Sequence, residues 1–311
     1  MKNKIFLIVK LIITVLLLIY IFNSVDIGKS HLLLMNIDLK YFIFALSLLM
    51  LQMLIANMRW WTILSYLNMH HGQFKLLRYF WAGLFFSQAL PSTIGGDALR
   101  GYYLFKNNHS IRDATFSIFL DRFFGLLALL IIVFITLPLL LDSISDPVAQ
   151  QGVIIISSGV FCLIVGIFFF QYLPSCFLKM HFFRELSEFS IGTYRLFFSL
   201  PSGLLLSGFS LCVHILSFLT IAVLSKGIGL DIDLLSIFLV VPFVSLIMVV
   251  PISIAGWGVR EGAMVLGFSY FGVVSDQSLA LSILYGLSLL SISLPGCFFW
   301  VLNSRRVNKH N

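Results

Sequence analysis

Long runs of apolar residues, separated by short polar segments, dominate this chain. A helix needs roughly 20 residues to cross about 30 Å of hydrocarbon, so the longer runs predict membrane-spanning helices. Two further apolar regions, 79–105 and 234–271, are each broken in the middle by proline and glycine. The pattern predicts an all-α polytopic membrane protein with two broken regions and six full transmembrane helices, at residues 5–22, 41–58, 115–141, 153–172, 203–224 and 278–302.

The first broken region has arms, residues 79–90 and 94–105, that are too short to span a membrane alone. Each arm gives about 18 Å of helix at about 1.5 Å per residue. The region is therefore either one kinked crossing or a re-entrant hairpin that enters and leaves on the same side.

The placement of basic residues favours the hairpin, because cytoplasmic loops are enriched in Lys and Arg. With two hairpins, most Lys and Arg residues, Arg59 among them, fall on the cytoplasmic side. With one kinked crossing, the basic 173–202 loop would move outside and the acidic 142–152 loop inside. We therefore expect two hairpins in a protein of the cytoplasmic (inner) membrane, with the N-terminus and the C-terminus both cytoplasmic.

An odd number of crossings separates the two hairpins, so they should enter from opposite sides. Residues 1–311 then form a single transmembrane domain whose approximate halves, 1–150 and 151–311, are inverted repeats. Secondary transporters with inverted repeats and broken helices hold their substrate at the repeat interface, near the bilayer midplane. We expect the two breaks to meet there.

The two breaks carry the same residue pattern. Residues 91–101 read Pro-Ser-Thr-Ile-Gly-Gly-Asp-Ala-Leu-Arg-Gly, and residues 251–262 read Pro-Ile-Ser-Ile-Ala-Gly-Trp-Gly-Val-Arg-Glu-Gly. The two stretches align without a gap, and Arg100 matches Arg260. Charged residues are costly in hydrocarbon and are usually functional there. Our hypothesis is that the two turns form one site.

The break residues are suited to binding a phosphate group. A Thr or Ser precedes each expected half-helix and would be its N-cap, and the free N–H groups and dipole of a helix N-terminus attract anions. Guanidinium matches phosphate in bidentate geometry, and glycine lets a ligand or a neighbouring backbone come close. The predicted phosphate-binding residues are Arg100, Arg260, Thr93, Gly95, Gly96, Ser253, Gly256 and Gly258.

Six charged residues remain within the apolar regions, three basic and three acidic. An unpaired charge at the bilayer centre costs about 3 kcal/mol or more on insertion scales, so we expect these residues to pair with one another. Ion pairs that only hold the helices together are the alternative to a binding site. Asp97 or Glu261 is also a candidate proton carrier, because burial raises the pKa of a carboxylate. The residues predicted for gating or charge pairing are Asp97, Glu261, Trp257, Asp121 and Arg122.

Composition excludes an ordinary soluble domain. Hydrophobic residues make up 59% of the 311 residues and charged residues only 11%, against about a quarter charged in soluble domains. The net charge of +7 is explained by the Lys and Arg residues of the predicted cytoplasmic loops, so we expect no nucleic-acid partner. The four cysteines have no metal-ligand spacing, and no nucleotide loop or nucleophile and base pair is present. We expect no metal, no cofactor and no catalytic residue.

Four stretches resemble the lysylphosphatidylglycerol synthase transmembrane-region family. They are Met-Arg-Trp-Trp at 58–61, residues 90–102, Asp-Arg-Phe-Phe-Gly at 121–125, and residues 251–262. Members are flippase-like integral membrane proteins of bacteria and archaea, and the best-known ones move lysyl-phosphatidylglycerol between leaflets and carry a cytosolic aminoacyl-transferase domain. Without that domain, the resemblance implies a stand-alone member that does not aminoacylate lipid. Asp121 stands where many relatives have glutamate.

The leading hypothesis is a non-enzymatic flippase that moves a phosphate-bearing lipid headgroup, of a phospholipid or a polyprenyl-linked glycan, across the membrane. Its expected partners are membrane lipids and a separate lipid- or glycan-modifying enzyme. One alternative is a membrane-embedded transferase acting on a lipid phosphate, with Asp97 or Glu261 as base. Another is an accessory subunit of such an enzyme. The lipid, the direction and energy source of transport, and the oligomeric state stay open.

Overall fold

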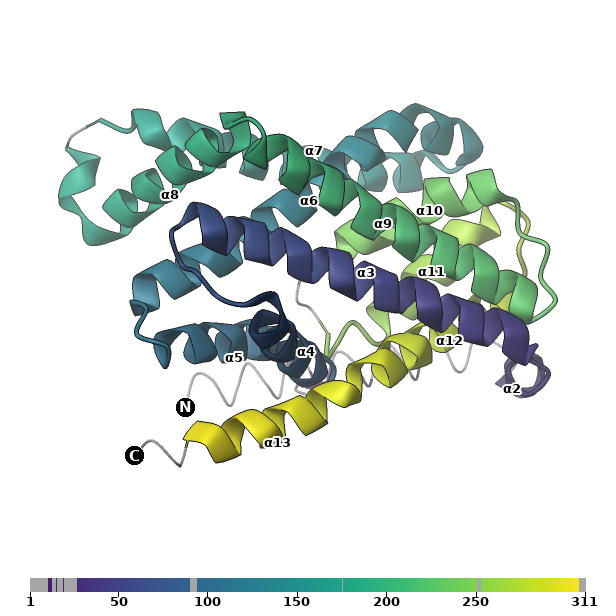
Figure 1. The fold of residues 1–311 in the computed structure, drawn as a ribbon. Helices are drawn as coiled ribbons and strands as arrows, with labels where there is room; N and C mark the ends of the chain where they lie inside the picture. The colour runs from purple at the N-terminus through teal and green to yellow at the C-terminus, as the bar shows by residue number, and fades with distance from the viewer. Residues whose placement is uncertain are drawn as a thin grey trace.

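The computed structural model describes residues 11, 12, 15, 19, 27–89, 94–174, 176–250 and 253–307. This part of the chain is helical and contains no strand (Figure 1). Five stretches in it are long and apolar enough to cross a membrane, and they match five of the six predicted crossings. The sixth, at 5–22, lies largely outside the described residues. The five stretches are α3 (Leu39–Tyr66), α6 (Ile111–Ser143), Pro147–Tyr172, α9 (Ser202–Gly227) and Ser275–Leu302.

The remaining elements are shorter helices or parts of these stretches. Pro147–Tyr172 consists of α7 (Pro147–Phe169) and η1 (Phe170–Tyr172), and Ser275–Leu302 joins α12 (Ser275–Ser293) to α13 (Pro295–Val307). The others are α2 (Ile27–Met35), α4 (Gln73–Ala89), α5 (Ile94–Phe105), η2 (Phe177–Lys179), α8 (His181–Phe198), α10 (Leu234–Ile247) and α11 (Val259–Ser269).

Polar caps in the loops fix where three of the long helices begin, α3, α6 and α7. Asp38 accepts a hydrogen bond from Lys40 N at the start of α3, and Ser110 accepts one from Asp113 N at the start of α6. Asp146 caps α7 just before its first residue, Pro147. Such side chains satisfy N–H groups that have no partner inside the helix. These three apolar stretches therefore begin at polar residues that belong in the loops.

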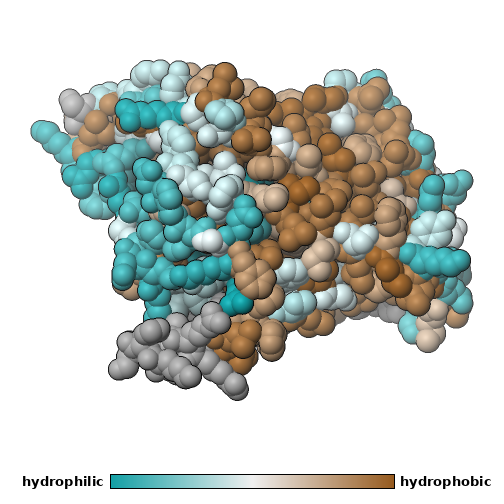
Figure 2. Space-filling model, in the orientation of Figure 1, coloured by the Kyte–Doolittle hydropathy of each residue, from teal (hydrophilic) through white to brown (hydrophobic). Residues whose placement is uncertain are grey.

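The surface of the molecule is that of a membrane protein. Hydrophobic side chains cover the middle of the face shown in Figure 2, and hydrophilic ones gather at its two ends. Large apolar side chains on α6 and α7, such as Ile135 and Ile155, are exposed. Apolar side chains can face lipid on the outside of helices whose backbone groups are bonded internally. The chain is a multi-pass membrane protein.

The loops meet in two groups. At one end, His71 Nε2 lies 2.9 Å from His109 Nε2, which joins the loop after α3 to the loop after α5. Arg112, just beyond, donates to Glu185 of α8 at 2.9 Å. This end therefore includes part of the 173–202 loop, which was predicted to be cytoplasmic.

The opposite group joins the remaining loops. Asp38 N donates to Gly227 O at 2.8 Å, and Ser30 Oγ donates to Asp276 O at 3.0 Å. The first bond joins the start of α3 to the end of α9, and the second joins α2 to the start of α12. The two groups of loops lie at opposite ends of the long helices (Figure 1).

The first broken region is a hairpin of α4 and α5. Tyr79 and Tyr103 stack with ring centroids 4.6 Å apart, and Asn107 Nδ2 donates to Tyr79 Oη at 3.0 Å. Nearer the tip, a Cβ on Gly96 would overlap Gly83 O. From the first pair to the second, the residue number rises in α4 and falls in α5, so the two helices are antiparallel. The two helices therefore form a hairpin, which begins at Gln73, earlier than expected. That it enters and leaves the membrane on the same side stays a prediction.

The second broken region is a hairpin of α10 and α11. A Cβ on Gly267 would lie 2.6 Å from Val240 Cγ1, and one on Gly256 would overlap the Met248 side chain. Residues 229–233 and 271–273, at its two ends, line one pocket. That pocket shares Gln277 with a pocket lined by residues of α2. This hairpin therefore opens at the end opposite to the first.

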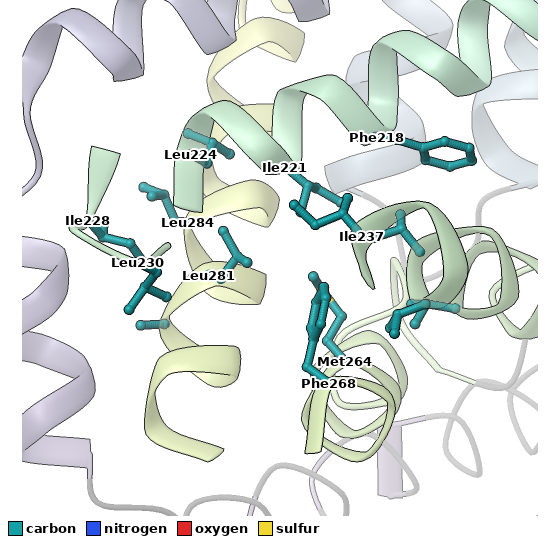
Figure 3. Close-up of a cluster of buried hydrophobic side chains, with 14 of the residues drawn as sticks. Phe218, Ile221, Leu224, Ile228, Leu230, Ile237, Met264, Phe268, Leu281 and Leu284 are labelled. Carbon is teal, nitrogen blue, oxygen red and sulfur yellow. The ribbon is translucent and has the colours of Figure 1, made fainter. Parts of the chain in front are cut away.

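A hydrophobic cluster packs the second hairpin against α9 and α12 (Figure 3). Its side chains are almost fully buried, so the hairpin is anchored along its length rather than only at its ends. Members that Figure 3 labels are Phe218, Ile221, Leu224, Ile228, Leu230, Ile237, Met264, Phe268, Leu281 and Leu284.

The close approach of α4 and α5 gives a stability prediction. Gly96→Ala places a methyl group against Gly83 O and Ser87 Oγ, and overpacking of this kind typically costs about 1–3 kcal/mol. Gly159→Ala is the matched control, because nothing lies within 4 Å of a Cβ at Gly159. We expect thermal unfolding of the purified protein in detergent to shift several degrees lower for Gly96→Ala only. Equal shifts would contradict the packing of the hairpin.

Candidate functional site

A carboxylate held between two guanidinium groups forms the centre of the first cluster. Asp121 of α6 accepts from Arg59 Nε of α3 at 2.8 Å through Oδ1, and from Arg100 Nη2 of α5 at 2.9 Å through Oδ2. The exposed fractions are only 2% for Asp121, 8% for Arg59 and 4% for Arg100. Charge-assisted hydrogen bonds of this length are the strong kind. They tie three helices together inside the apolar region.

Asp97 extends this cluster toward the surface. It pairs with Arg100, three residues later on the same helix, at 3.3 Å, and with Arg122 at 2.9 Å. The Arg122 side chain is 59% exposed, so the cluster reaches the outside of the helices there. With three guanidinium groups and two carboxylates, the cluster carries one formal positive charge in excess.

Arg59 corrects the sequence prediction, which counted it among the loop charges of the cytoplasmic side. It lies within α3, a helix of 28 residues that continues to Tyr66. Its guanidinium also donates to Ser210 Oγ of α9 at 3.2 Å, and a Cβ on Gly125 would lie 3.2 Å from its Nη1. The apolar run ends at residue 58, but the helix continues through Arg-Trp-Trp. Sequence reasoning missed this continuation.

Aromatic rings cover both arginines of the repeated pattern. The Arg100 guanidinium lies 4.1 Å from the ring centroid of Trp60 and 4.9 Å from that of Phe80. Arg260 lies 4.8 Å from the ring centroid of Trp257. Cation–π contacts of this kind stabilise a desolvated cation by about 2 kcal/mol. Trp60 was not predicted as a site residue.

The second cluster surrounds Arg260 and Glu261 of α11. Arg260 Nη2 donates to Glu261 Oε1 at 2.7 Å, and Ser282 Oγ of α12 donates to the same oxygen at 3.1 Å. Both charged residues are buried. A Cβ on Gly286 would overlap the Arg260 guanidinium, so α12 provides both a hydroxyl and the space that the arginine occupies.

The start of α11 differs from the prediction. Its N-cap is Gly258, whose N–H donates to Glu261 Oε2 at 2.6 Å, so the expectation that Ser253 caps this helix is wrong. Ala255, Gly256 and Gly258 have φ values of 48°, 80° and 85°, and left-handed backbone cannot continue into a helix. The helix therefore begins only at Val259, and Ser253 Oγ is buried without a hydrogen-bond partner among the described residues.

The start of α5 is built in another way. Gly95, Gly96 and Asp97 lie in the first turn of α5, which begins at Ile94. Asp97 is there favourably placed against the positive end of the helix dipole. Thr93, the predicted N-cap, lies outside the described residues. Matching residues of the two copies are thus helical in one hairpin and in left-handed turns in the other.

Pairing was predicted for the six interior charges, and the structure confirms it for all of them: Asp97, Arg100, Asp121, Arg122, Arg260 and Glu261. The pairs form two clusters held by different helices. Arg100 is tied to α3 and α6, and Arg260 is packed against α12. That the two turns form one pocket stays a prediction. Within the described residues, no three His, Cys, Asp or Glu side chains lie close enough to hold a metal ion.

Comparison with known proteins gives one match. The family model for the lysylphosphatidylglycerol synthase TM region matches residues 7–296. The matched range includes both hairpins and both charged clusters. No curated protein and no solved structure matches the chain.

The first cluster gives a prediction on stability. Asp121→Ala leaves Arg59 and Arg100 buried without their shared carboxylate, and breaking a buried pair costs about 3–5 kcal/mol. Arg112→Ala breaks the exposed pairs with Glu185 and Glu188, and exposed pairs contribute about 0–1 kcal/mol. The midpoint of thermal unfolding in detergent should therefore be clearly lower for Asp121→Ala than for Arg112→Ala. Similar midpoints would show that the Asp121 bridge is not what holds α3, α5 and α6 together.

Proposed function

The chain belongs to the lysylphosphatidylglycerol synthase TM region family, and from this premise we propose that it is a flippase-like transporter of a lipid. The phosphate-bearing headgroup of a phospholipid or polyprenyl-linked glycan would cross through the protein while the tails remain in the bilayer. The observation that carries the proposal is the pair of buried arginine clusters, one in each of two hairpins that open at opposite ends.

The proposed topology has six crossings, two re-entrant hairpins and two halves related as inverted repeats, with both termini on the cytoplasmic side of the inner membrane. Opposite opening of the hairpins supports the inverted arrangement. Short half-helices inside a bilayer are tolerated when they are buried in protein or line a cavity. Such half-helices surround the substrate in transporters with inverted repeats.

The first cluster is the proposed binding site for the headgroup phosphate. Its excess positive charge attracts an anion, and Arg100 Nε is buried without a hydrogen-bond partner among the described residues. A buried donor without a partner costs about 1–3 kcal/mol, more when it is charged. A phosphate oxygen at Arg100 Nε removes that cost.

Asp121 makes this binding reversible. Its two oxygens bridge Arg59 and Arg100 in the way that two oxygens of a phosphate would. The carboxylate therefore competes with the headgroup for the same guanidinium groups. A transport site must bind well enough to admit its substrate and weakly enough to release it, and an internal competitor meets both needs.

Asp97 and Arg122 form the proposed entrance. Arg122 is the exposed member of the cluster, so a headgroup at the membrane surface would meet it first. Asp97 holds Arg122 and Arg100 at once. Transfer of the phosphate from Arg122 to Arg100 then requires only that Asp97 exchange one of its two partners.

The second cluster is the proposed exit on the opposite side. Here Glu261 neutralises Arg260, and its two carboxylate oxygens accept bonds from Gly258 N, Arg260 and Ser282. The left-handed turn at Gly256 and Gly258 supplies further groups for the headgroup, as does Ser253 Oγ, which has no partner within the described part of the chain. This cluster should hold the phosphate less tightly than the first, because it has no excess charge.

The proposal predicts that both arginines are needed for transport. In proteoliposomes with a fluorescent phospholipid, Arg100→Ala and Arg260→Ala should each reduce leaflet exchange to the rate of protein-free vesicles, because each removes a guanidinium that binds phosphate. Arg112→Ala, the control, should exchange lipid like the wild type. Exchange that persists in both arginine variants would contradict the proposal.

Two further outcomes have a clear meaning. Arg100→Lys keeps the charge but not the bidentate fork, so its exchange rate should lie between those of the wild type and Arg100→Ala. If purified protein instead forms a new lipid product from lipid and an activated donor, the protein is a transferase and the transport proposal is wrong.

A further inference from the structure

Two cations at the open end of the first hairpin, where α4 begins and α5 ends, lie over aromatic rings. The Arg78 guanidinium is 4.5 Å from the ring centroid of Phe74, and Lys106 Nζ is 5.4 Å from that of Tyr102. Each cation follows its ring by four residues, so the two share a helix face. The face of an aromatic ring attracts a cation at these distances. Each helix therefore presents a positive charge together with an apolar ring.

Contacts between the two helices place these pairs at the same level of the hairpin. Lys75 Nζ donates to Asn107 Oδ1, and the Tyr79 ring stacks on Tyr103 with centroids 4.6 Å apart. Since α4 and α5 are antiparallel, these contacts bring the two cation–π pairs to one distance from the open end. Lys75 adds a third positive charge there.

The protein does not neutralise these three charges. Neither Lys75, Arg78 nor Lys106 forms an ion pair with a carboxylate in the described part of the chain. Arg112, a nearby cation, is instead held by two carboxylates of α8. Arg78 Nε is also buried without a hydrogen-bond partner within the same residues, which is unfavourable. An external anion can therefore bind at Lys75, Arg78 and Lys106, and not at Arg112.

The aromatic surroundings favour a lipid over a dissolved anion. The exposed fractions of Phe74, Tyr102 and Phe105 are 63%, 45% and 48%. Aromatic side chains are enriched where a membrane meets water, and Lys or Arg beside them can extend to the headgroups. A dissolved phosphate would leave the three rings in water. A phospholipid covers them with its tails and offers its phosphate to the cations.

We propose that Lys75, Arg78 and Lys106 bind the headgroup phosphate of an anionic phospholipid in the leaflet at this end of the molecule. The lipid remains in that leaflet and holds the open end of the hairpin at headgroup level, so the inference does not depend on the transport function. The open end of the second hairpin instead carries Asp231 and Asp233, which repel an anionic headgroup.

The test titrates purified protein in a neutral detergent with phosphatidylglycerol, or with phosphatidylcholine of the same tails, and follows the midpoint of thermal unfolding. Phosphatidylglycerol should raise the midpoint of the wild type at lower concentrations than phosphatidylcholine. Arg78→Gln and Lys106→Gln should each raise the half-saturating concentration of phosphatidylglycerol about fivefold, as expected for one basic residue near an anionic headgroup. Their response to phosphatidylcholine should not change.

Two control variants show whether charge at these positions is what matters. Arg112→Gln, which removes a cation already paired with carboxylates, should respond to both lipids like the wild type. Arg78→Lys keeps the charge and should retain most of the response to phosphatidylglycerol. The Arg100 cluster is the same in all these variants, so lipid bound there contributes equally to each.

Three results would overturn the inference. The first is an equal response of the wild type to the two lipids. The second is a response to phosphatidylglycerol that persists when Arg78→Gln and Lys106→Gln are combined, because the lipid then binds elsewhere. The third is a midpoint that sodium phosphate raises as far as phosphatidylglycerol does, compared with sodium chloride of equal ionic strength, because the ligand is then free phosphate.

Discussion

The bridge from Asp121 to Arg59 and Arg100 is the interaction on which the structure depends. It holds three helices at one point, α3, α5 and α6. Two of them are long and apolar enough to cross a membrane, and the third is too short. A charge buried in hydrocarbon needs a partner, and here each partner comes from a different helix. The hairpin is thereby fixed in place by the same groups that we propose bind the substrate.

The second helix of each hairpin begins in a different way. In α5 the glycine at 96 lies within the helix and lets it approach Gly83 of α4. In the second hairpin, glycines with positive φ turn the chain before α11 begins, and Glu261 then caps the helix and pairs with Arg260. The first cluster has an excess positive charge and the second is a neutral pair. Along the proposed route, the affinity for phosphate therefore decreases from the first cluster to the second.

Sequence reasoning predicted what depends on length and charge, and missed what depends on contacts between distant helices. Apolar run lengths located the five described spans, and charge placement favoured hairpins that open at opposite ends. Arg59 was misplaced because its environment comes from Asp121 and Ser210, both far away in the chain. Ser253 was wrongly expected to cap α11, because residues after it have positive φ values and delay the start of the helix.

Direct observation of bound lipid tests the central claim most sharply. The measurement is an electron cryomicroscopy structure of the protein in lipid nanodiscs, together with the Arg100→Ala variant prepared in the same way. We expect phosphate density within hydrogen-bond distance of Arg100 in the native protein, away from both headgroup layers, and its loss in the variant. Phosphate density confined to the two headgroup layers, with Asp121 still bridging Arg59 and Arg100, would contradict the account.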